Sequence, residues 1–529
     1  MDAVSGWFTL STRDPSTPSY AALFPHGNRP LRTSPVRTLA ATCALAALAS
    51  GCASIATVTG QTDATADAMQ SETSGTTSYS GQHRVVVSFN DETGNAGKVI
   101  YTQNTRKILK GASLMGWSYS GDRGKTWTYG GKVAPPDGWS VLWGDPAMTT
   151  SGAGYGVVFI SNLAIPDSKF PAGGIDGYVT YGSKGSYIGG ACIARSTNGG
   201  VTFQNYQCVA NKEADAGDPD AVKGHFYDGG SMASTPSGEV FAAFVDVTKS
   251  RIDVWRAPKH DGVFERIADP FPGLVAATHP RLRATLEGWL YAATTIVDGS
   301  GYLVYVNRYR NGQWGKAVQA SEYAVSYPEV QLGSTVQGHP LTIRTGPQFS
   351  FDIGAVSEGG NDAVRFLYTR RNSNGRLFVE GSACPFDLSK CFPVKEWKSG
   401  PSSPEATPYD AFNPSVSAWR GFIGLPPHWT SSFYSRYGQS VAKVSLARMN
   451  LAYANGNPIG IPVDLAKDIT VCSDTRGYWG DYDDMLHAGF DDTTPVFIRF
   501  TSTDLGKGCN KRWTFVAGHQ HVQSVREPK

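Results

Sequence analysis

Hydrophobic positions in this chain come in short runs, each bounded by turns rich in Gly, Pro, Asn and Asp. The first run, VVVSF, starts at Val85, and a recurring unit follows it: a turn, a strand, a Gly-containing turn and a more apolar strand. Each strand spans roughly five to eight residues, and the residue types between strands are those of β-hairpin turns. Copies of the unit begin at Gly144, Asp228, His279, Phe351, Asn413 and Gly480.

Further strand pairs lie between these copies, as in IDVWRAPKHDGVFERI from Ile252 and GYLVYVNRYRNGQWGKAVQ from Gly301. Two hairpins per unit make a four-stranded antiparallel sheet. A succession of such sheets with few helical patterns predicts an all-β fold, a β-propeller of six or seven blades. Two β-sandwiches are the alternative, which we disfavour because no linker divides residues 84–529. These residues are therefore expected to form one propeller.

The composition agrees with this fold and excludes some functions. The 529 residues include 60 Gly, with 12% aromatic and 17% charged residues, as expected for tight turns around aromatic-rich strands. The net charge of +2 gives no strong field for recruiting nucleic acid or an anionic membrane surface. No GxSxG, P-loop or dinucleotide fingerprint occurs in a suitable strand–helix setting. We expect a monomer that binds no nucleic acid.

A targeting signal is predicted near the N-terminus. Arginines at positions 29, 32 and 37 precede the apolar run TLAATCALAALASGC, which ends at Cys52 and is too short to span a membrane. Its end, ASGC, resembles the lipobox of bacterial lipoproteins, with Leu48 one position earlier than the usual leucine. The resemblance implies lipidation of Cys52; ordinary cleavage nearby without a lipid is the alternative. A translation start near Val36 would give a signal of more ordinary length and leave residues 1–35 untranslated.

The segment after the signal is expected to be a flexible tether. Residues 53–83 are rich in Ser, Thr, Ala and Gly and lack apolar periodicity. The protein is therefore expected to be exported, either as a cell-envelope lipoprotein (periplasm or outer membrane) or in secreted form. Membrane contact is expected through the lipid anchor only.

Cysteine usage agrees with export. Six cysteines lie outside the signal, and an even number in an exported chain indicates disulfides. No CxxC occurs, so their spacing does not suit a zinc site. Proximity in the sequence predicts the pairs Cys192–Cys208, Cys384–Cys391 and Cys472–Cys509.

One turn sequence occurs three times in related forms. SGDRGKTW, from Ser120 to Trp127, has the pattern S-x-D-x-G-x-x-W. It resembles the Asp-box (BNR repeat) of the sialidase (neuraminidase) superfamily of propellers. STNGGVTF is a second copy, and STDLGKGCNKRW is a third, interrupted one. The matching residues are Ser120, Asp122, Gly124, Thr126 and Trp127; then Ser196, Asn198 and Phe203; then Ser502, Asp504 and Trp513.

Elementary chemistry gives these residues a structural role. Ser and Asp side chains bond to main-chain amides at a hairpin tip, and Gly124 supplies a positive φ. Trp127 is expected to leave the turn and pack between blades. The resemblance places the Asp-box on the propeller side away from the active site. The pair Cys192–Cys208 would then staple the two strands that flank the second box.

A second resemblance lies near the C-terminus. GYWGDYDDM, from Gly477 to Met485, looks like a Trp-Gly-Asp-Tyr motif of secreted bacterial sialidase-like proteins. This motif does not define an activity.

Candidate chemistry is expected where the inner strands of a propeller meet. The residues just before the first strand of each unit would face this funnel, and carboxylates beside an arginine suit a sugar or metal site. Simple turn chemistry is the alternative, and Asp145 and Asp228 fit it well. The candidates are Asp145, Asp228, Arg281, Asp352, Asn413 and Asp481.

The resemblance does not extend to the sialidase catalytic pattern. Family enzymes hold the substrate carboxylate with three arginines, the first in an Arg-Ile-Pro motif, and the corresponding region VVVSFNDETG lacks it. A Tyr–Glu nucleophile pair and an Asp acid complete that family site. No residue here matches the pattern position by position, so a true sialidase is not expected. The substitutes considered are Arg281, Arg283, Arg344, Arg365 and Trp479 for substrate binding, with Glu329 and Tyr482 for chemistry.

Metal binding is not expected. His225, His279 and His487 lie near predicted inner strands, but no short ligand spacing links them. An acidic cluster offers oxygen ligands for calcium, and a solvated acidic loop is the favoured interpretation. Its members are Asp481, Asp483, Asp484, Asp491 and Asp492. No cofactor is therefore expected.

Two functions remain. The first is a carbohydrate-active enzyme of the glycoside hydrolase type that works in the central funnel. The second is a non-catalytic propeller that binds a glycan or a protein at the cell envelope. An enzyme should place two carboxyl groups about 5–9.5 Å apart on one cavity. The catalytic candidates are Asp145, Asp228, Asp352, Asp481 and Tyr482.

Overall fold

The structure is a computed structural model whose described residues are strands and turns, without an α-helix. Among them, no helix has the length and apolarity to cross a membrane. The described side chains lie between residues 74 and 433, with gaps. The described residues are 54–58, 70–78, 84–91, 99–101, 106–124, 126–152, 156–167, 178–181, 189–210, 227–276, 280–298, 301–321, 329–336, 339–344, 349–354, 364–371, 377–394, 409–419, 428–437, 443–454, 457–459, 463–470, 484–489, 492–502 and 520–526.

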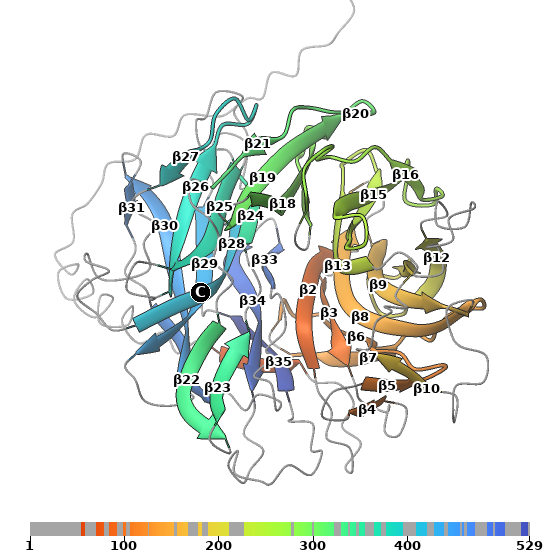
Figure 1. Cartoon of the computed structure of the whole chain (residues 1–529), viewed down its shortest axis with the longest axis horizontal. Coiled ribbons are helices and arrows are strands. Elements are labelled where there is room, and N and C mark those ends of the chain that lie inside the picture. The colour runs from red at the N-terminus through yellow and green to blue at the C-terminus, as the bar shows by residue number, and fades with distance from the viewer. Residues whose placement is uncertain are drawn as a thin grey trace, which may run out of the picture. The chain divides into compact units, whose positions relative to one another are not determined.

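Seven sheets in this part of the chain share one pattern of four or five antiparallel strands (Figure 1). In six of them the strands follow one another along the chain. The first three are β2 (Gln70–Ser78), β3 (Arg84–Asp91), β6 (Met115–Ser120) and β7 (Thr128–Lys132); β8 (Trp139–Thr150), β9 (Val158–Pro166), β11 (Gly190–Ser196) and β12 (Gln204–Ala210); and β13 (Tyr227–Ser234), β14 (Val240–Asp246), β15 (Arg251–Ala257) and β16 (Glu265–Ile267).

The next three sheets continue in chain order. They are β17 (Arg281–Ala284), β18 (Leu290–Asp298), β19 (Gly301–Arg310), β20 (Gln313–Trp314) and β21 (Val318–Gln319); β24 (Phe349–Ile353), β25 (Val364–Arg371), β26 (Leu377–Cys384) and β27 (Phe392–Val394); and β28 (Tyr409–Trp419), β29 (His428–Tyr437), β30 (Lys443–Ala454), β31 (Asn457–Ile459) and β32 (Val463–Thr470).

The seventh sheet joins the two ends of the described chain. It contains β33 (Asp484–Gly489), β34 (Asp492–Ser502) and β35 (Gln520–Arg526), and β1 (Ser54–Val58) pairs antiparallel with β35. Two small sheets stand apart from this pattern. They are β4 (Val99–Tyr101), β5 (Arg106–Leu109) and β10 (Tyr178–Tyr181), and β22 (Glu329–Val336) with β23 (His339–Arg344).

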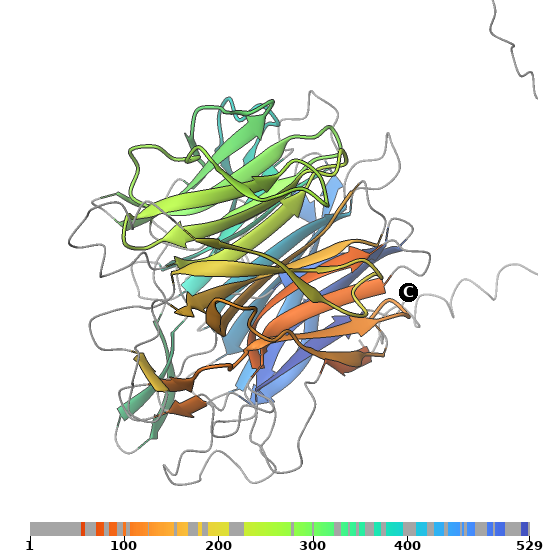
Figure 2. The same ribbon diagram turned by 90° about the vertical axis from the view of Figure 1, so that its right-hand side faces the viewer.

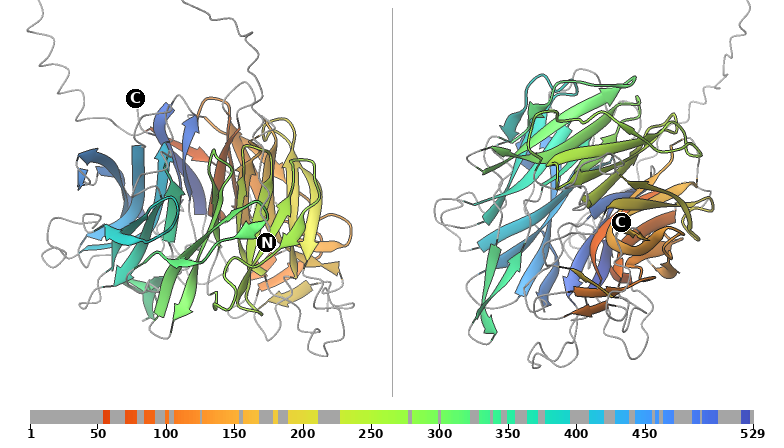
Figure 3. Two further views of the ribbon diagram at one scale, coloured as in Figure 1. Left: turned by 90° about the horizontal axis from the view of Figure 1, so that it is seen from above. Right: turned by 45° about the vertical axis from the view of Figure 1, so that its right-hand side comes forward.

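Apolar cores lie between successive sheets, which the further views show face to face (Figures 2 and 3). All seven residues of β14, VFAAFVD, are buried, because alternate side chains face different neighbouring sheets. Phe244 joins the core shared with β8 and β9, and Phe241 joins the core shared with β17 and β18. Uninterrupted apolar strands are therefore central strands with a sheet on each side.

The first strands of the seven sheets contact one another in sequence. Contacts run from β2 to β8, β13, β17, β24, β28 and β33, and β33 also contacts β2. Serines bridge three of these junctions by accepting a backbone N–H from the next strand. The bonds are Met148 N to Ser74 Oγ (3.1 Å), Leu282 N to Ser231 Oγ (2.8 Å) and Val416 N to Ser350 Oγ (3.1 Å).

The expected tether needs correction. Within residues 53–83 the structure has β1 and β2, and β2 pairs along its length with β3. The Ser and Thr side chains, which predicted a flexible segment, form contacts with a neighbouring strand instead. Ser74 binds the neighbouring first strand, and Thr76 Oγ1 lies 2.9 Å from Thr150 Oγ1. These polar side chains of β2 therefore connect it to β8. Cys52 and the predicted signal lie outside the described residues.

Two of the three predicted disulfides are confirmed. Cys192 and Cys208 are directly opposite on β11 and β12, so their bond staples the third strand of that sheet to the fourth. Cys384 ends β26 and bonds to Cys391 across a short turn. The pair Cys472–Cys509 lies outside the described residues.

The turns at Ser120 and Ser196 have the same hydrogen bonds. Ser120 Oγ accepts the Gly124 amide at 2.7 Å, and Ser196 Oγ accepts the Gly200 amide at 2.8 Å. Two residues beyond each serine, a side-chain oxygen accepts a later amide: Thr126 N to Asp122 Oδ1 (2.8 Å) and Thr202 N to Asn198 Oδ1 (3.0 Å). These bonds satisfy the hairpin tips locally, which agrees with the structural role expected of the two turns.

The aromatic residues of the two turns differ in burial. Phe203 is 9% exposed and meets Trp117 edge to face at 5.3 Å. Trp127 is only half-buried, so the expected packing of this ring between sheets is incomplete. In the third copy, Ser502 is the last residue of β34, and Asp504 and Trp513 lie outside the described residues.

Candidate functional site

The predicted funnel residues lie on the first strands but inside them, not just before them. Asp228 is the second residue of β13, and Arg281 begins β17. Asp352 is the fourth residue of β24, and Asn413 is the fifth of β28. Asp145 lies in the middle of β8, because that strand begins at Trp139. The sequence suggested a turn at Gly144–Asp145, where the chain kinks within a continuing strand.

Asp352 joins three neighbouring first strands. Its Oδ2 accepts the amide of Ala418 on β28 at 2.8 Å, and its Oδ1 lies 3.6 Å from Nε of Arg283 on β17. Oδ1 also accepts the following amide, that of Ile353, at 2.9 Å. The Asp352 side chain is 10% exposed, whereas the Arg283 side chain is 26% exposed. The carboxylate is thus held inside the protein, and the guanidinium beside it reaches solvent.

Arg281 and Arg283 lie two apart on β17, the spacing that places both on one face of a strand. Arg283 also donates from Nη1 to the carbonyl of Leu282 at 3.0 Å, and its guanidinium lies 6.0 Å from the ring centroid of Phe351. Asp352 and Phe351 therefore orient the arginine from the next strand. An oriented, partly exposed guanidinium is a donor for carboxylate or hydroxyl oxygens.

Asp145 and Asn413 share an unusual backbone. Their φ angles are +55° and +51°, and each precedes a proline. The pairing of β8 and of β28 with the next strand shifts register at these positions. Positive φ in a non-glycine residue costs of order 1–3 kcal/mol and clusters at functional sites. Asp145 is 8% exposed, and its amide donates to Asn90 Oδ1 on β3 at 2.7 Å.

Asp228 stands beside a buried charged cluster that the sequence analysis missed. Its own Oδ1 accepts the Gly229 amide at 3.0 Å, which is the turn chemistry expected for it. The preceding residue, Tyr227, is fully buried, and its hydroxyl donates to Asp253 Oδ2 at 2.7 Å. Arg266 Nη2 lies 2.7 Å and Arg251 Nε 3.0 Å from Asp253 Oδ1.

Burial is the main cause of the raised pKa values in this charged cluster. Desolvation raises the pKa of Asp253, although the bond from Tyr227 and the two arginines oppose the rise. Desolvation likewise raises the pKa of Tyr227, and the adjacent carboxylate of Asp253 adds to the effect. The cluster anchors the beginning of β13, where Asp228 lies. Its residues are spread over β13, β15 and β16, so no local sequence pattern could reveal it.

Other predicted residues are not brought to this site. Arg365 lies on β25, 1% exposed, with its guanidinium 4.7 Å from the ring centroid of Trp429. It packs between sheets, so its proposed role in substrate binding is wrong. Arg344 and Glu329 lie on β23 and β22, where only the backbone is described. Five further candidates lie outside the described residues: Trp479, Asp481, Tyr482, His225 and His279. His487 is described only by its place in β33. Among the residues with described side chains, no group of three or more His, Cys, Asp or Glu could hold a metal ion.

Comparisons with known proteins give weak likenesses. No family model matches the chain, and no curated protein matches it. Among solved structures, a point mutant of NanB sialidase from Streptococcus pneumoniae aligns with a TM-score of 0.41 and 9% identity, over 71% of this chain and 67% of that one. The leech intramolecular trans-sialidase gives 0.38 and 8%, over 89% and 70%. The exo-β-1,3-galactanase 1,3Gal43A from Clostridium thermocellum gives 0.34 and 11%, over 85% and 92%.

These TM-scores and identities are too low to carry a fold or an activity over to this chain. The fold and the candidate site therefore rest on the strand pairing and the side-chain contacts of this chain itself.

Proposed function

We propose that this chain is an exported, sialidase-like β-propeller whose seven repeated sheets are its blades, and that it acts on glycans at the meeting point of the first strands. The succession of antiparallel sheets with apolar cores between them supports the propeller. Two disulfides support export, since such bonds persist in oxidising compartments. Lipidation of Cys52 belongs to the same proposal.

The observation that carries the glycan site is the unit formed by Arg283 and Asp352. Two neighbouring first strands supply an oriented cation and a buried carboxylate, and a third strand supplies the amide that fixes the carboxylate. Glycans are recognised by such fixed donors and acceptors because every hydroxyl both donates and accepts. In this arrangement Asp352 positions Arg283, and Arg283 contacts the ligand.

The proposed reaction is hydrolysis of a glycosidic bond, with Asp145 and Asp228 as the carboxyl pair. One carboxylic acid protonates the leaving oxygen as its bond to the anomeric carbon breaks. The other carboxylate takes a proton from the water whose oxygen bonds to that carbon. Asp145 is the stronger candidate because its strained backbone, φ +55°, persists in a first strand. Asp481 and Tyr482 remain predicted participants.

A non-catalytic glycan-binding propeller is the second candidate. It is favoured by the fixed contacts of Asp352, which engages an arginine and two amides. A glycan array probed with the full chain, followed by product analysis on every positive glycan, separates the two. Shorter products that disappear in Asp145→Asn or Asp228→Asn identify an enzyme. Binding without products, in wild type and in both variants, identifies the binding module.

A further inference from the structure

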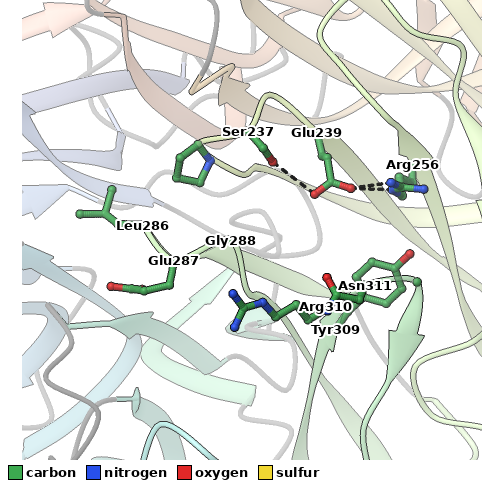
Figure 4. A pocket seen from close by; sticks show the side chains of 11 residues that line it. Ser237, Glu239, Arg256, Leu286, Glu287, Gly288, Tyr309, Arg310 and Asn311 are labelled. Carbon is green, nitrogen blue, oxygen red and sulfur yellow. Dashed lines mark hydrogen bonds and ion pairs between the residues drawn. The ribbon is translucent and has the colours of Figure 1, made fainter. Parts of the chain in front are cut away.

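A cleft lies at the other end of the sheets from Asp228. It is formed by the turns β13–β14, β17–β18 and β19–β20 and has a volume of about 570 Å³, within the range of small-molecule sites (Figure 4). Strand β13 runs from Asp228 to these turns, so roughly 20 Å separates the cleft from Asp228. Arg283 is nearer, because on β17 it lies three residues before Leu286 of the cleft. The cleft residues used below are Ser237, Glu239, Arg256, Leu286, Glu287, Gly288, Tyr309, Arg310 and Gly312.

Each wall of the cleft carries one carboxylate and one guanidinium. On the first wall, Glu239 Oε1 accepts from Arg256 Nη2 at 2.6 Å and from Nε at 2.8 Å (Figure 4). On the facing wall lie Glu287 and Arg310 (Figure 4). Arg310 is held by Trp289, whose ring centroid is 4.8 Å from the guanidinium. The cleft is therefore polar on both sides, and its two carboxylates and two guanidiniums leave no net charge.

Neutral hydrogen-bonding groups extend this lining. Burial raises the pKa of Tyr309, so its hydroxyl stays protonated at neutral pH and can donate. Gly288 and Gly312 have positive φ, and nothing lies within 4 Å of where a Cβ would stand. The Gly288 amide is bonded within its turn, to the Thr285 carbonyl at 3.2 Å, so these glycines contribute open space to the cleft. The Ser237 hydroxyl lies 3.4 Å from Glu239 Oε2 at the rim.

This lining selects one class of ligand. An anion would meet two glutamates, and Arg256 is already engaged by Glu239. An apolar ligand would find little apolar surface, mainly the side chains of Pro236 and of Leu286, which is 55% exposed. A neutral polyhydroxylated ligand suits the cleft, because each hydroxyl can donate to a carboxylate and accept from a guanidinium.

We propose that this cleft is a second binding site, for a segment of a neutral oligosaccharide. Glu287 and Arg310 bind it from one wall and Glu239 from the other. The site shares no residue with the first-strand site and goes beyond the function proposed there. A polysaccharide that occupied both sites would be held more tightly than either site alone allows.

The test uses the full chain carrying Arg283→Ala, so that the first-strand site is weakened in every sample. The probes are fluorescently labelled linear cello-, xylo- and galacto-oligosaccharides, titrated by anisotropy. We expect at least one to bind, with Kd raised about tenfold or more by Glu287→Ala and by Arg310→Ala, each of which removes a charge-assisted hydrogen bond. Leu286→Trp, which fills the cleft from its rim, should abolish binding.

The matched control is Glu265→Ala, an exposed glutamate on β16 outside the cleft, which should leave Kd unchanged. Leu286, Glu287, Arg310 and Glu265 are exposed, and thermal unfolding unchanged from that of the Arg283→Ala protein confirms that each further variant folds. The proposal is overturned if none of these probes binds the Arg283→Ala protein, or if Kd is the same with and without Leu286→Trp. Preference for sulfated oligosaccharides over neutral ones of equal length would also overturn it. A separate comparison tests the first-strand site. If wild type and Arg283→Ala bind the array glycan equally well, the first-strand proposal fails, whatever the result for the cleft.

Discussion

Asp352→Ala tests whether one buried carboxylate holds three first strands together. The substitution removes the acceptor of the Ala418 amide, 2.8 Å away, and the partner of Arg283, 3.6 Å away. Ala418 is 8% exposed, so water cannot readily replace the lost acceptor. An unsatisfied buried N–H costs about 1–3 kcal/mol, and an unpaired, partly exposed arginine adds less than a fully buried one would. We expect the free energy of unfolding to fall by about 2–4 kcal/mol.

Asp352→Asn keeps one side-chain oxygen and should cost roughly 1 kcal/mol, because it loses the charge but can retain the amide bond. The matched control is Asp298→Ala, an exposed aspartate at the end of β18, which should change stability by less than about 0.5 kcal/mol. Denaturant unfolding gives these differences.

Hydrogen exchange gives the local result. In Asp352→Ala the Ala418 amide should exchange at least about tenfold faster. The Val416 amide, held by Ser350 Oγ at 3.1 Å, should keep more of its protection. Equal stability in Asp352→Ala and Asp298→Ala, or unchanged exchange at Ala418, would refute the bridging role.

Three further predictions concern the fold. Cys192 and Cys208 are 16 residues apart, and reducing their bond or replacing both by Ser should lower the free energy of unfolding by about 3 kcal/mol, because the unfolded chain gains loop entropy. Denaturant unfolding measures this difference, and no change would mean that the bond does not constrain the unfolded chain. Asp122→Ala should lower the free energy of unfolding by about 1 kcal/mol, because the two hydrogen bonds from Thr126 are lost. Glycan binding should stay unchanged, and weaker binding would contradict a purely structural role for this turn. Burial raises the pKa of Asp253 above its unfolded value of 3.8, so its contribution to stability is full below pH 3.8 and is lost as pH rises through the folded pKa. The slope of stability against pH should therefore become less negative in Asp253→Asn, and an identical slope in both proteins would be evidence against the raised pKa.

The sequence predicted the strands and turns well where local chemistry determines them. Gly-rich turns marked the hairpins, and the related patterns at Ser120 and Ser196 anticipated two turns with the same hydrogen bonds. The disulfide pairs followed from proximity because consecutive strands of a sheet lie side by side. Each of these features depends on residues close in the chain.

Long-range contacts explain what the sequence could not show. The Ser/Thr-rich segment before Arg84 resembled a tether because it lacks apolar periodicity, whereas β2 pairs with β3 and its polar side chains contact β8. Asp145 resembled a turn residue because Gly, Asp and Pro in succession are typical of turns, whereas in the structure Asn90 on a neighbouring sheet holds its amide within a continuing strand. The ion pair between Arg283 and Asp352 joins residues far apart in sequence.

Glycan binding by Arg283→Ala is the most direct measurement of the proposed first-strand site. Full-length wild type and variant are titrated with the strongest glycan from the array, and Lys316→Ala, an exposed cation between β20 and β21, is the control. We predict that Arg283→Ala raises Kd at least about tenfold, Arg283→Lys raises it less, and Lys316→Ala leaves it unchanged. Equal affinity in wild type and Arg283→Ala would contradict the assignment of the glycan site to the first strands.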